Sequence, residues 1–309
     1  MSRHPTGQTA GGQGMLALAW MRFRRHRLAL GSTVVLAVLA ALAVAAPLVE
    51  AILGTSFGEV DLFNRFAAPS PAHPLGTDEL GRDVLVRLLH GGRISLAVGL
   101  TAAVVSAILG TVVGLSAGYY GGRLDALLMR FTDGVIALPF LPLLIVLAAV
   151  DLGKLGLPAA VVQSEYVSLM RIVAIVALVG WTTVARLVRG AALSLREREF
   201  VLAAHAQGAG GMRIMAVHIL PNLVSPIVVA TTLSVGNVIL LESVLSFLGL
   251  GIEPAIPSWG NLLTGAQELI WDAPALAFYP GLLIFATVIA FNFLGDGLQD
   301  ALDPKAMEG

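Results

Sequence analysis

The stretch Leu28–Val49, LALGSTVVLAVLAALAVAAPLV, contains 22 consecutive residues without a charged side chain. A helix of that length is about 33 Å long and can cross the roughly 30 Å hydrocarbon core of a bilayer. The run exceeds the roughly 7–15 apolar residues of a secretory signal peptide, and further apolar runs follow it. It therefore predicts a transmembrane helix and not a cleaved leader.

Composition supports a membrane protein. The chain has 309 residues, of which 57% are hydrophobic and only 13% are charged. Soluble domains average about 25% charged residues, so the apolar excess here must face lipid. The net charge of −1 gives no reason to expect a nucleic-acid partner. The absence of cysteine excludes disulfides, thiolate metal ligands and thiol nucleophiles.

Five further apolar runs predict five more spans, and helices are expected because lipid cannot satisfy open backbone groups. The fourth span is the weakest, since only Ile172–Ala185 is free of charge and Arg171 must reach outward. We predict an all-α membrane protein with six transmembrane helices. The expected divisions are a cytoplasmic tail (1–27), the first span (28–49), an external loop (50–93), a domain with the remaining five spans (94–302) and a second tail (303–309). The five spans correspond to the apolar runs 94–117, 134–150, 166–185, 223–252 and 273–294. A cytoplasmic loop (190–221) lies between the fourth and fifth spans.

The distribution of basic residues predicts the orientation. With the N-terminus inside, 13 of the 19 Lys and Arg residues fall in inner segments and six in outer ones. Cytoplasmic segments are enriched in Lys and Arg, so both termini are expected in the cytoplasm.

Two helices are expected to lie along the outer membrane surface. In the first, Thr77 or Asp78 is a suitable N-cap, and Gly91 and Gly92 are expected to stop the helix. An alternative role for it is a dock for an external partner. The second is expected over Asn261–Trp271, flanked by Trp259 and Trp271 as aromatic residues flank membrane interfaces.

Three glycines lie at four-residue spacing in the second span: Gly110, Gly114 and Gly118. This spacing puts them on one face of a helix, where a neighbouring helix can approach closely. Helix packing is the expected role.

The segment between the fourth and fifth spans is the most informative. It reads Arg196-Glu-Arg-Glu-Phe-Val-Leu-Ala-Ala-His-Ala-Gln-Gly208 and closes with His218-Ile-Leu-Pro-Asn222. We expect a helix that ends at Gly208, then a short helix that Pro221 ends. The small side chains of the two alanines leave room for a partner, and the charges would orient it. The alternative is an ordinary solvated loop.

This segment resembles the loop with which permeases of ABC importers contact their ATPases. Leu202 stands where that family has Glu, and His218 stands where it has Ile. Arg198 and Glu199 are candidates for the charge that Leu202 lacks. The resemblance implies a coupling loop whose contacts come from Arg198, Glu199, Ala203, Ala204, Gly208, His218 and Pro221.

Three more segments resemble the second, C-type permease of the dipeptide, oligopeptide and nickel branch: His73–Leu96, Glu242–Gly260 and Phe291–Pro304. The resemblance implies the type I importer fold in a prokaryotic cytoplasmic membrane. It also implies a homologous B-type permease, two cytosolic ATPases and an external peptide-binding protein as partners.

An ATPase site is not expected in this chain. A phosphate-binding loop requires Gly-Lys followed by Ser or Thr. The chain's lysines are Lys154, which Leu155 follows, and Lys305. ATP must therefore act through another chain, and no cofactor is expected here.

Glu242 is the one acidic residue inside an apolar run. Ionisable groups at membrane depth are unfavourable and often functional, so a residue of the translocation path or gate is one interpretation. The other is placement near a helix end, with a packing partner such as an Arg of a sister subunit. Metal sites are not expected at Asp296, Asp300 and Asp303, nor at His205 and His218.

We therefore predict a permease subunit that moves dipeptides and oligopeptides by alternating access and carries out no covalent chemistry. Nickel chelates or other small solutes are alternative substrates. A secondary transporter driven by an ion gradient should show buried charge pairs and repeats. An intramembrane enzyme should show a catalytic constellation in the spans, and neither pattern is evident. A pure scaffold is a further alternative.

Overall fold

The computed structural model describes residues 15–150, 152–155, 158 and 165–302. All of the regular elements in these ranges are helical. The elements are α1 (Met15–Arg25), α2 (Arg27–Leu53), η1 (Leu62–Asn64), α3 (Val84–Tyr120), α4 (Gly122–Ala137), α5 (Phe140–Ala148), η2 (Leu152–Leu155), α7 (Glu165–Leu195), α8 (Glu199–Ala206), α9 (Gly211–Arg213), η3 (Ile214–Ile219), α10 (Leu220–Phe247), η4 (Asn261–Leu263), α11 (Ala266–Leu269) and α12 (Pro274–Leu302).

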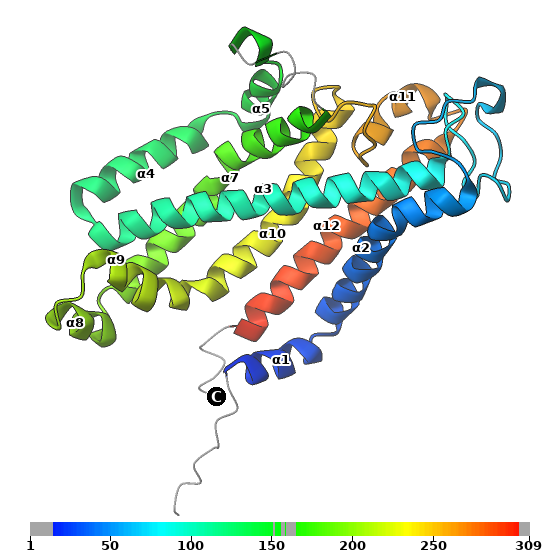
Figure 1. Ribbon diagram of the computed structural model, residues 1–309. Helices are drawn as coiled ribbons and strands as arrows, with labels where there is room; N and C mark the ends of the chain where they lie inside the picture. The colour runs from blue at the N-terminus through cyan, green and yellow to red at the C-terminus, as the bar shows by residue number, and fades with distance from the viewer. Residues whose placement is uncertain (1–14, 151, 156–157, 159–164, 303–309) are drawn as a thin grey trace, which may run out of the picture.

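The long helices form one bundle. α2, α12, α10 and α7 lie side by side, and α3 crosses over one face of this row (Figure 1). The bundle has two ends. We call the end that holds α8, α1 and the last turn of α12 the α8 end. The opposite end, with α11 and the segment 54–83, is the α11 end (Figure 1).

Five of the described helices are long and apolar enough to cross a membrane, and the pair α4 and α5 makes six if it is one broken span. The prediction of an all-α, multi-pass protein is confirmed. The fourth span is a single helix, α7, in spite of its short uncharged run. The third predicted span is not a single helix, because α4 and α5 meet at an angle of 85°. Leu138 is extended, since a following proline disfavours helical backbone, and Pro139 is the N-cap of the next helix, which begins at Phe140.

The prediction of a separate surface helix that begins near residue 84 is wrong. α3 runs without a break from Val84 through Gly91 and Gly92 to Tyr120. Its N-cap is Asp83, whose Oδ1 accepts the backbone N–H of Val86 at 2.8 Å. The two glycines do not stop the helix, because the backbone and ring of Trp259 pack directly against them.

The second predicted surface helix is also absent as a continuous element. Residues 261–271 form two short pieces, η4 and α11, and Gly265 between them has a φ of +76°. Trp271 is exposed, but Trp259 is buried inside the protein and does not flank an interface.

Part of the predicted N-terminal tail is helical. Residues 15–25 form α1, which packs on α12 and is followed by a break at His26.

The three spaced glycines of α3 all face α7. A Cβ on Gly110 would lie 2.5 Å from the carbonyl oxygen of Trp181, and one on Gly118 would lie 2.7 Å from Cβ of Ala192. A Cβ on Gly114 would meet the backbone of Ala185. These glycines let α3 and α7 lie in close contact along their length.

Candidate functional site

The turn at the α8 end is built on a glycine. α8 ends at Ala206, and Gly208 adopts a left-handed conformation with φ of +81°. A Cβ on Gly208 would meet no atom within 4 Å, so the backbone conformation alone favours glycine here. The N–H of Ala209 then bonds the carbonyl oxygen of Ala204 at 3.1 Å, which closes the end of the helix.

The second half of the turn differs from the prediction. Pro221 does not end a helix. The chain is continuously helical from Gly211 to Phe247, and Pro221 lies in the first turn of α10. A π-helical turn, η3, comes directly before it and changes the hydrogen-bond register. Pro221 therefore directly follows the change of register.

The two alanines of the turn have opposite environments. Val201 and Ala204 are buried against Ile214 and Ile219 of η3. Ala203 is exposed, on the face that points away from the bundle. Helical periodicity explains this, because residues 201 and 204 share one face of α8.

The outward surface of the turn is rich in exposed apolar side chains. Leu202, at the position where the wider family has Glu, is 56% exposed. The surface, which we call the α8 surface, consists of Phe200, Leu202, Met212 and Val217. Exposed apolar side chains gain free energy when another protein covers them. Around it, Arg198, Glu199, Gly208 and Pro221 are exposed, and His218 is half-buried.

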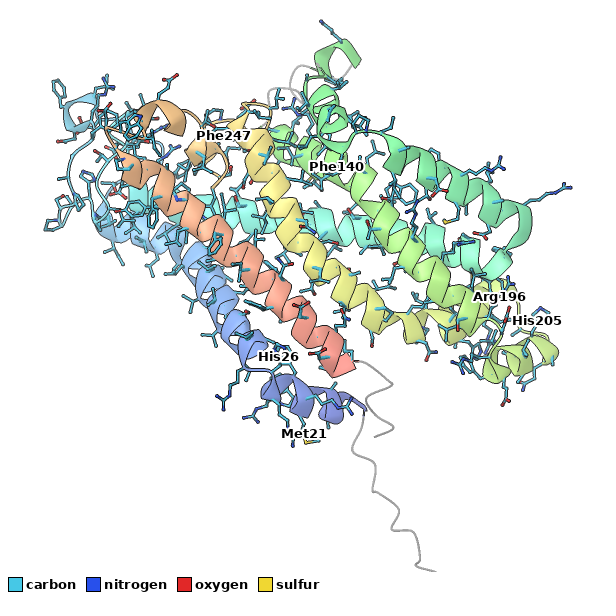
Figure 2. The ribbon with its side chains drawn as sticks, turned by 180° about the vertical axis from the view of Figure 1, so that it is seen from behind. Met21, His26, Phe140, Arg196, His205 and Phe247 are labelled. Atoms are coloured by element: carbon cyan, nitrogen blue, oxygen red, sulfur yellow. The ribbon has the colours of Figure 1, made fainter. Side chains whose placement is uncertain are left out.

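Polar contacts fix the turn to the bundle. Nη1 of Arg196, at the end of α7, lies 3.4 Å from the carbonyl oxygen of Tyr119 and 3.5 Å from that of Gly118. The ring of Tyr119 in turn packs on Gly211. Earlier in α7, Arg189 binds both carboxylate oxygens of Asp125 on α4, at 2.5 and 2.6 Å. Arg196 and His205 are both at this corner of the molecule (Figure 2). The α8 surface is therefore joined to α3 and α4 through α7.

Glu242 lies in the last third of α10, and its surroundings are entirely protein. It is 0% exposed. Its Oε1 accepts the hydroxyls of Ser246 at 2.7 Å and Ser258 at 2.9 Å, and its Oε2 lies 3.4 Å from the hydroxyl of Ser95. In this structure Glu242 faces no open path. No arginine or lysine of the described residues forms an ion pair with it.

The serine shell extends into a network that ties three segments together. Ser95 of α3 also accepts the backbone N–H of Trp259 at 3.1 Å. The indole N–H of Trp259 donates to the carbonyl oxygen of Leu88 at 3.0 Å. Asn261 donates its backbone N–H to Ser258 and receives the N–H of Ser258 in return. We call Glu242, Ser95, Ser246, Ser258, Trp259 and Asn261 the Glu242 cluster.

Sequence reasoning noticed Glu242 but not its partners. A buried carboxylate requires hydrogen-bond donors, so serines near it are an available signal. Two of the segments that carry the family resemblance contribute to the cluster: His73–Leu96 supplies Ser95, and Glu242–Gly260 supplies the other members named here except Asn261. Their convergence could not be read from the order of residues.

The carboxylates and histidines considered for metal binding do not gather. Asp300 lies 3.7 Å from His26, and Asp303 lies outside the described residues. Within the described residues, no group of three His, Asp or Glu side chains is placed to hold a metal ion.

The arrangement defines a class: a multi-pass helical membrane protein with exposed apolar side chains at one end of its bundle. Comparison with known families identifies the class more closely. Residues 110–308 match the binding-protein-dependent transport system inner membrane component, and residues 14–69 match the N-terminal transmembrane domain of oligopeptide transport permease C. The chain belongs to this family of transport permeases.

Relatives align over nearly the whole chain. A dipeptide transport system permease of Alkalihalophilus pseudofirmus is 39% identical over 287 residues, which cover 93% of this chain and 89% of the relative. A glutathione transport system permease of Pectobacterium atrosepticum is 40% identical, with 93% and 90% covered. An oligopeptide transport system permease of Bacillus subtilis is 36% identical, with 93% and 88% covered.

Proposed function

We propose that this chain forms one half of the membrane pathway of an ATP-driven importer of short peptides. The observation that carries the proposal is the α8 surface: exposed apolar side chains on a helical turn that has the spacing of the ATPase contact of ABC permeases. The family match and the names of the relatives support the same role.

The partners follow from the role. Two cytosolic ATPases supply the energy, and one of them docks on the α8 surface. A homologous permease completes the pathway, and an external binding protein delivers the peptide. The chain itself hydrolyses no ATP. Movement of the docked turn pulls on α7 and α10, the two helices that it connects, and this opens the pathway alternately to each side.

In the proposed orientation, the α8 end lies in the cytoplasm, together with both termini. The α8 turn, α1 and the end of α12 lie at the same end of the bundle (Figure 1). Arg22, Arg24, Arg25, Arg196 and Arg198 are all at that end, in accord with the enrichment of basic residues on the cytoplasmic side.

Short peptides are the proposed substrates because dipeptide, oligopeptide and glutathione appear in the names of the relatives, and glutathione is itself a tripeptide. A nickel chelate is the second candidate substrate. Transport of labelled dipeptide, glutathione and nickel-histidine chelate into proteoliposomes, assembled with the products of adjacent genes, separates these candidates.

Transport assays also test the energy source. Uptake should require ATP on the ATPase side and should persist when ionophores collapse ion gradients. The matched control is an ATPase with its phosphate-loop Lys changed to Ala, which should abolish uptake. Uptake that follows an ion gradient and ignores ATP would contradict the proposal in favour of a secondary transporter.

Crosslinking tests the docking surface directly, since the chain has no native cysteine. Ala204 is unsuitable because it is buried, so Leu202→Cys and His205→Cys are the probes. Both should crosslink to cysteines placed in the surface groove of the ATPase. Phe63→Cys, exposed on the segment 54–83, is the negative control. Failure at every groove position in an active complex would reject the docking role.

A further inference from the structure

α1 is a docked helix whose contacts fix its position. Phe23 is 7% exposed and lies in a cluster with Ala29 of α2 and Ala301 of α12. Gly297 of α12 allows this close contact, because a Cβ there would meet Ala29 and would lie 3.5 Å from the ring of Phe23. The side chain of His26 caps α2 by accepting the N–H of Ala29 at 3.0 Å.

The break at His26 turns α1 away from the axis of α2. His26 is extended, and α1 lies across the end of α2 and α12 and does not prolong either (Figures 1 and 2). α2 is a membrane span whose exposed side chains are apolar over most of its length. A helix that lies across the end of a span is at the depth of the lipid headgroups.

The exposed side of α1 has a regular pattern of residues, and at its edge the ring of Trp20 stacks on that of Phe23, with ring centroids 6.1 Å apart. Ala17, Trp20, Met21, Arg24 and Arg25 are exposed and follow the spacing i, i+3, i+4, i+7 and i+8 of one helix face. Trp20 is 57% and Met21 is 43% exposed. The face therefore changes from apolar and aromatic to basic as it approaches α2, as expected for a helix at the boundary between acyl chains and headgroups.

The basic part of the face continues onto the start of α2 with Arg27. Arg24, Arg25 and Arg27 make no ion pair within the described residues. The first carboxylate in the sequence is Glu50, at the far end of α2, so nothing earlier in the chain neutralises these arginines. Asp296 and Asp300 of α12 are exposed near this end, and Asp300 lies against His26.

We propose that the exposed face of α1, with Arg27, binds the headgroups of anionic phospholipids in the membrane that α2 crosses. Trp20 and Met21 enter the boundary of the acyl chains, and Arg24, Arg25 and Arg27 hold the phosphate groups. Arginine suits phosphate because its guanidinium donates two parallel hydrogen bonds. Since Phe23 fixes α1 to α12, the bound lipids also hold the end of α12.

Native mass spectrometry of the purified full chain in detergent can measure lipid binding and so test the proposed site. We expect phosphatidylglycerol to bind about tenfold more tightly than phosphatidylcholine, because basic residues near a membrane surface favour anionic lipids. The preference should fall as the ammonium acetate concentration rises, because salt screens exposed charges. An equal affinity for both lipids, at every salt concentration, would overturn the proposal without any variant.

Matched variants locate the site. The triple variant Arg24→Gln, Arg25→Gln, Arg27→Gln should lose most of the phosphatidylglycerol preference. The control Arg65→Gln, Arg93→Gln, Lys154→Gln removes the same charge from exposed positions elsewhere and should retain it. Equal losses in both triples would show a non-specific charge effect and refute the site. Replacing the three arginines by Lys should keep most of the preference.

Two further measurements test whether the ligand is a lipid or free phosphate, and whether α1 lies at the membrane. Inorganic phosphate should compete no better than sodium chloride of equal ionic strength, and full competition would make the site one for free phosphate. In nanodiscs, brominated phosphatidylglycerol should quench the fluorescence of Trp20, obtained as the difference between the wild type and Trp20→Phe. A Trp20 signal that bromine leaves unchanged would place α1 away from the lipid and refute the proposal.

Discussion

The Glu242 cluster and the α8 surface lie at opposite ends of the bundle and differ in polarity and in exposure. The first is an ionisable residue enclosed by hydroxyl groups of its own chain, with 0% of its surface exposed. The second consists of ordinary apolar residues, such as Leu202, that are left uncovered. The unusual residue is thus satisfied inside the protein, whereas the unremarkable residues are free for another molecule.

This contrast indicates where a second protein can bind. A polar group in an apolar interior is retained only when its hydrogen bonds are made, and all three contacts of Glu242 are internal. An apolar side chain in water gains from burial, so Leu202 and its neighbours favour association. Changes in the first region should act on stability, and changes in the second should act on assembly.

Glu242→Leu should have the largest effect. It leaves the buried hydroxyls of Ser246 and Ser258 without their acceptor and removes the link to α3, so we expect a loss of about 2–4 kcal/mol of stability. The measurement is the thermal unfolding midpoint of the purified chain in detergent. Glu253→Leu, at an exposed position beyond the end of α10, is the matched control and should change the midpoint little.

Glu242→Gln sharpens the same test. Gln keeps one acceptor oxygen, so it should cost less stability than Leu. If Glu242→Leu instead leaves the midpoint unchanged and abolishes peptide uptake, the residue belongs to the translocation path and the structural interpretation is wrong.

Leu202→Arg should have the next largest effect, and on a different quantity. A charge in the α8 surface must be desolvated in the contact, so we expect association with the ATPase to weaken about tenfold, or ~1.4 kcal/mol. The unfolding midpoint of the isolated chain should stay the same, since surface changes are usually within about 0.5 kcal/mol. Titration of labelled ATPase onto the permease complex in nanodiscs measures the affinity.

The control is Phe63→Arg, which puts the same charge on an exposed apolar residue of the segment 54–83. It should leave ATPase affinity unchanged. Unaltered affinity in Leu202→Arg, with normal affinity in the wild type, would show that the coupling contact lies elsewhere on the chain.

Run length and composition were enough to predict five of the spans, because membrane depth imposes one length on every helix that crosses it. Even α7 could be found, although Arg171 interrupts its run. The break between α4 and α5 was missed, although Leu138 before Pro139 is a local signal for it. α3 was divided wrongly because Gly91 and Gly92 suggested a stop, whereas the structure uses them for contact with Trp259.

The site was predictable to a smaller extent. The spacing of the turn indicated the α8 segment, but not that Ala203 is exposed and Ala204 buried, since this depends on the position of η3. The partners of Glu242 are harder still, because Ser95 is 147 residues away and Ser258 is 16. Hydrogen bonds between such distant residues follow from how the helices pack, and periodicity carries no information about them.

Gly208→Ala should have a moderate effect, confined to the α8 surface. Alanine disfavours the left-handed backbone of Gly208 by about 1 kcal/mol, and no neighbouring atom adds a clash. Hydrogen exchange should therefore show more frequent opening of residues 199–210, with the core of the bundle unchanged. Gly190→Ala is the control, because it also meets no atom but lies inside α7, where Ala is favourable. Faster exchange throughout the bundle would show that the turn and the bundle unfold together.

Ser95→Ala should have the smallest effect and tests how far the Glu242 cluster depends on its weakest member. The bond from Ser95 to Glu242 is long at 3.4 Å, but the same hydroxyl accepts the backbone N–H of Trp259, which would lose its partner. We expect a loss of about 0.5–1 kcal/mol. Ser106→Ala is a closely matched control: Ser106 is also buried in α3, and its hydroxyl has no hydrogen-bond partner among the described residues. That change should be neutral or slightly stabilising, since it removes a polar group that makes no bond. If the two serine variants have equal unfolding midpoints, Ser95 adds nothing to the cluster, and Glu242 is held by Ser246 and Ser258 alone.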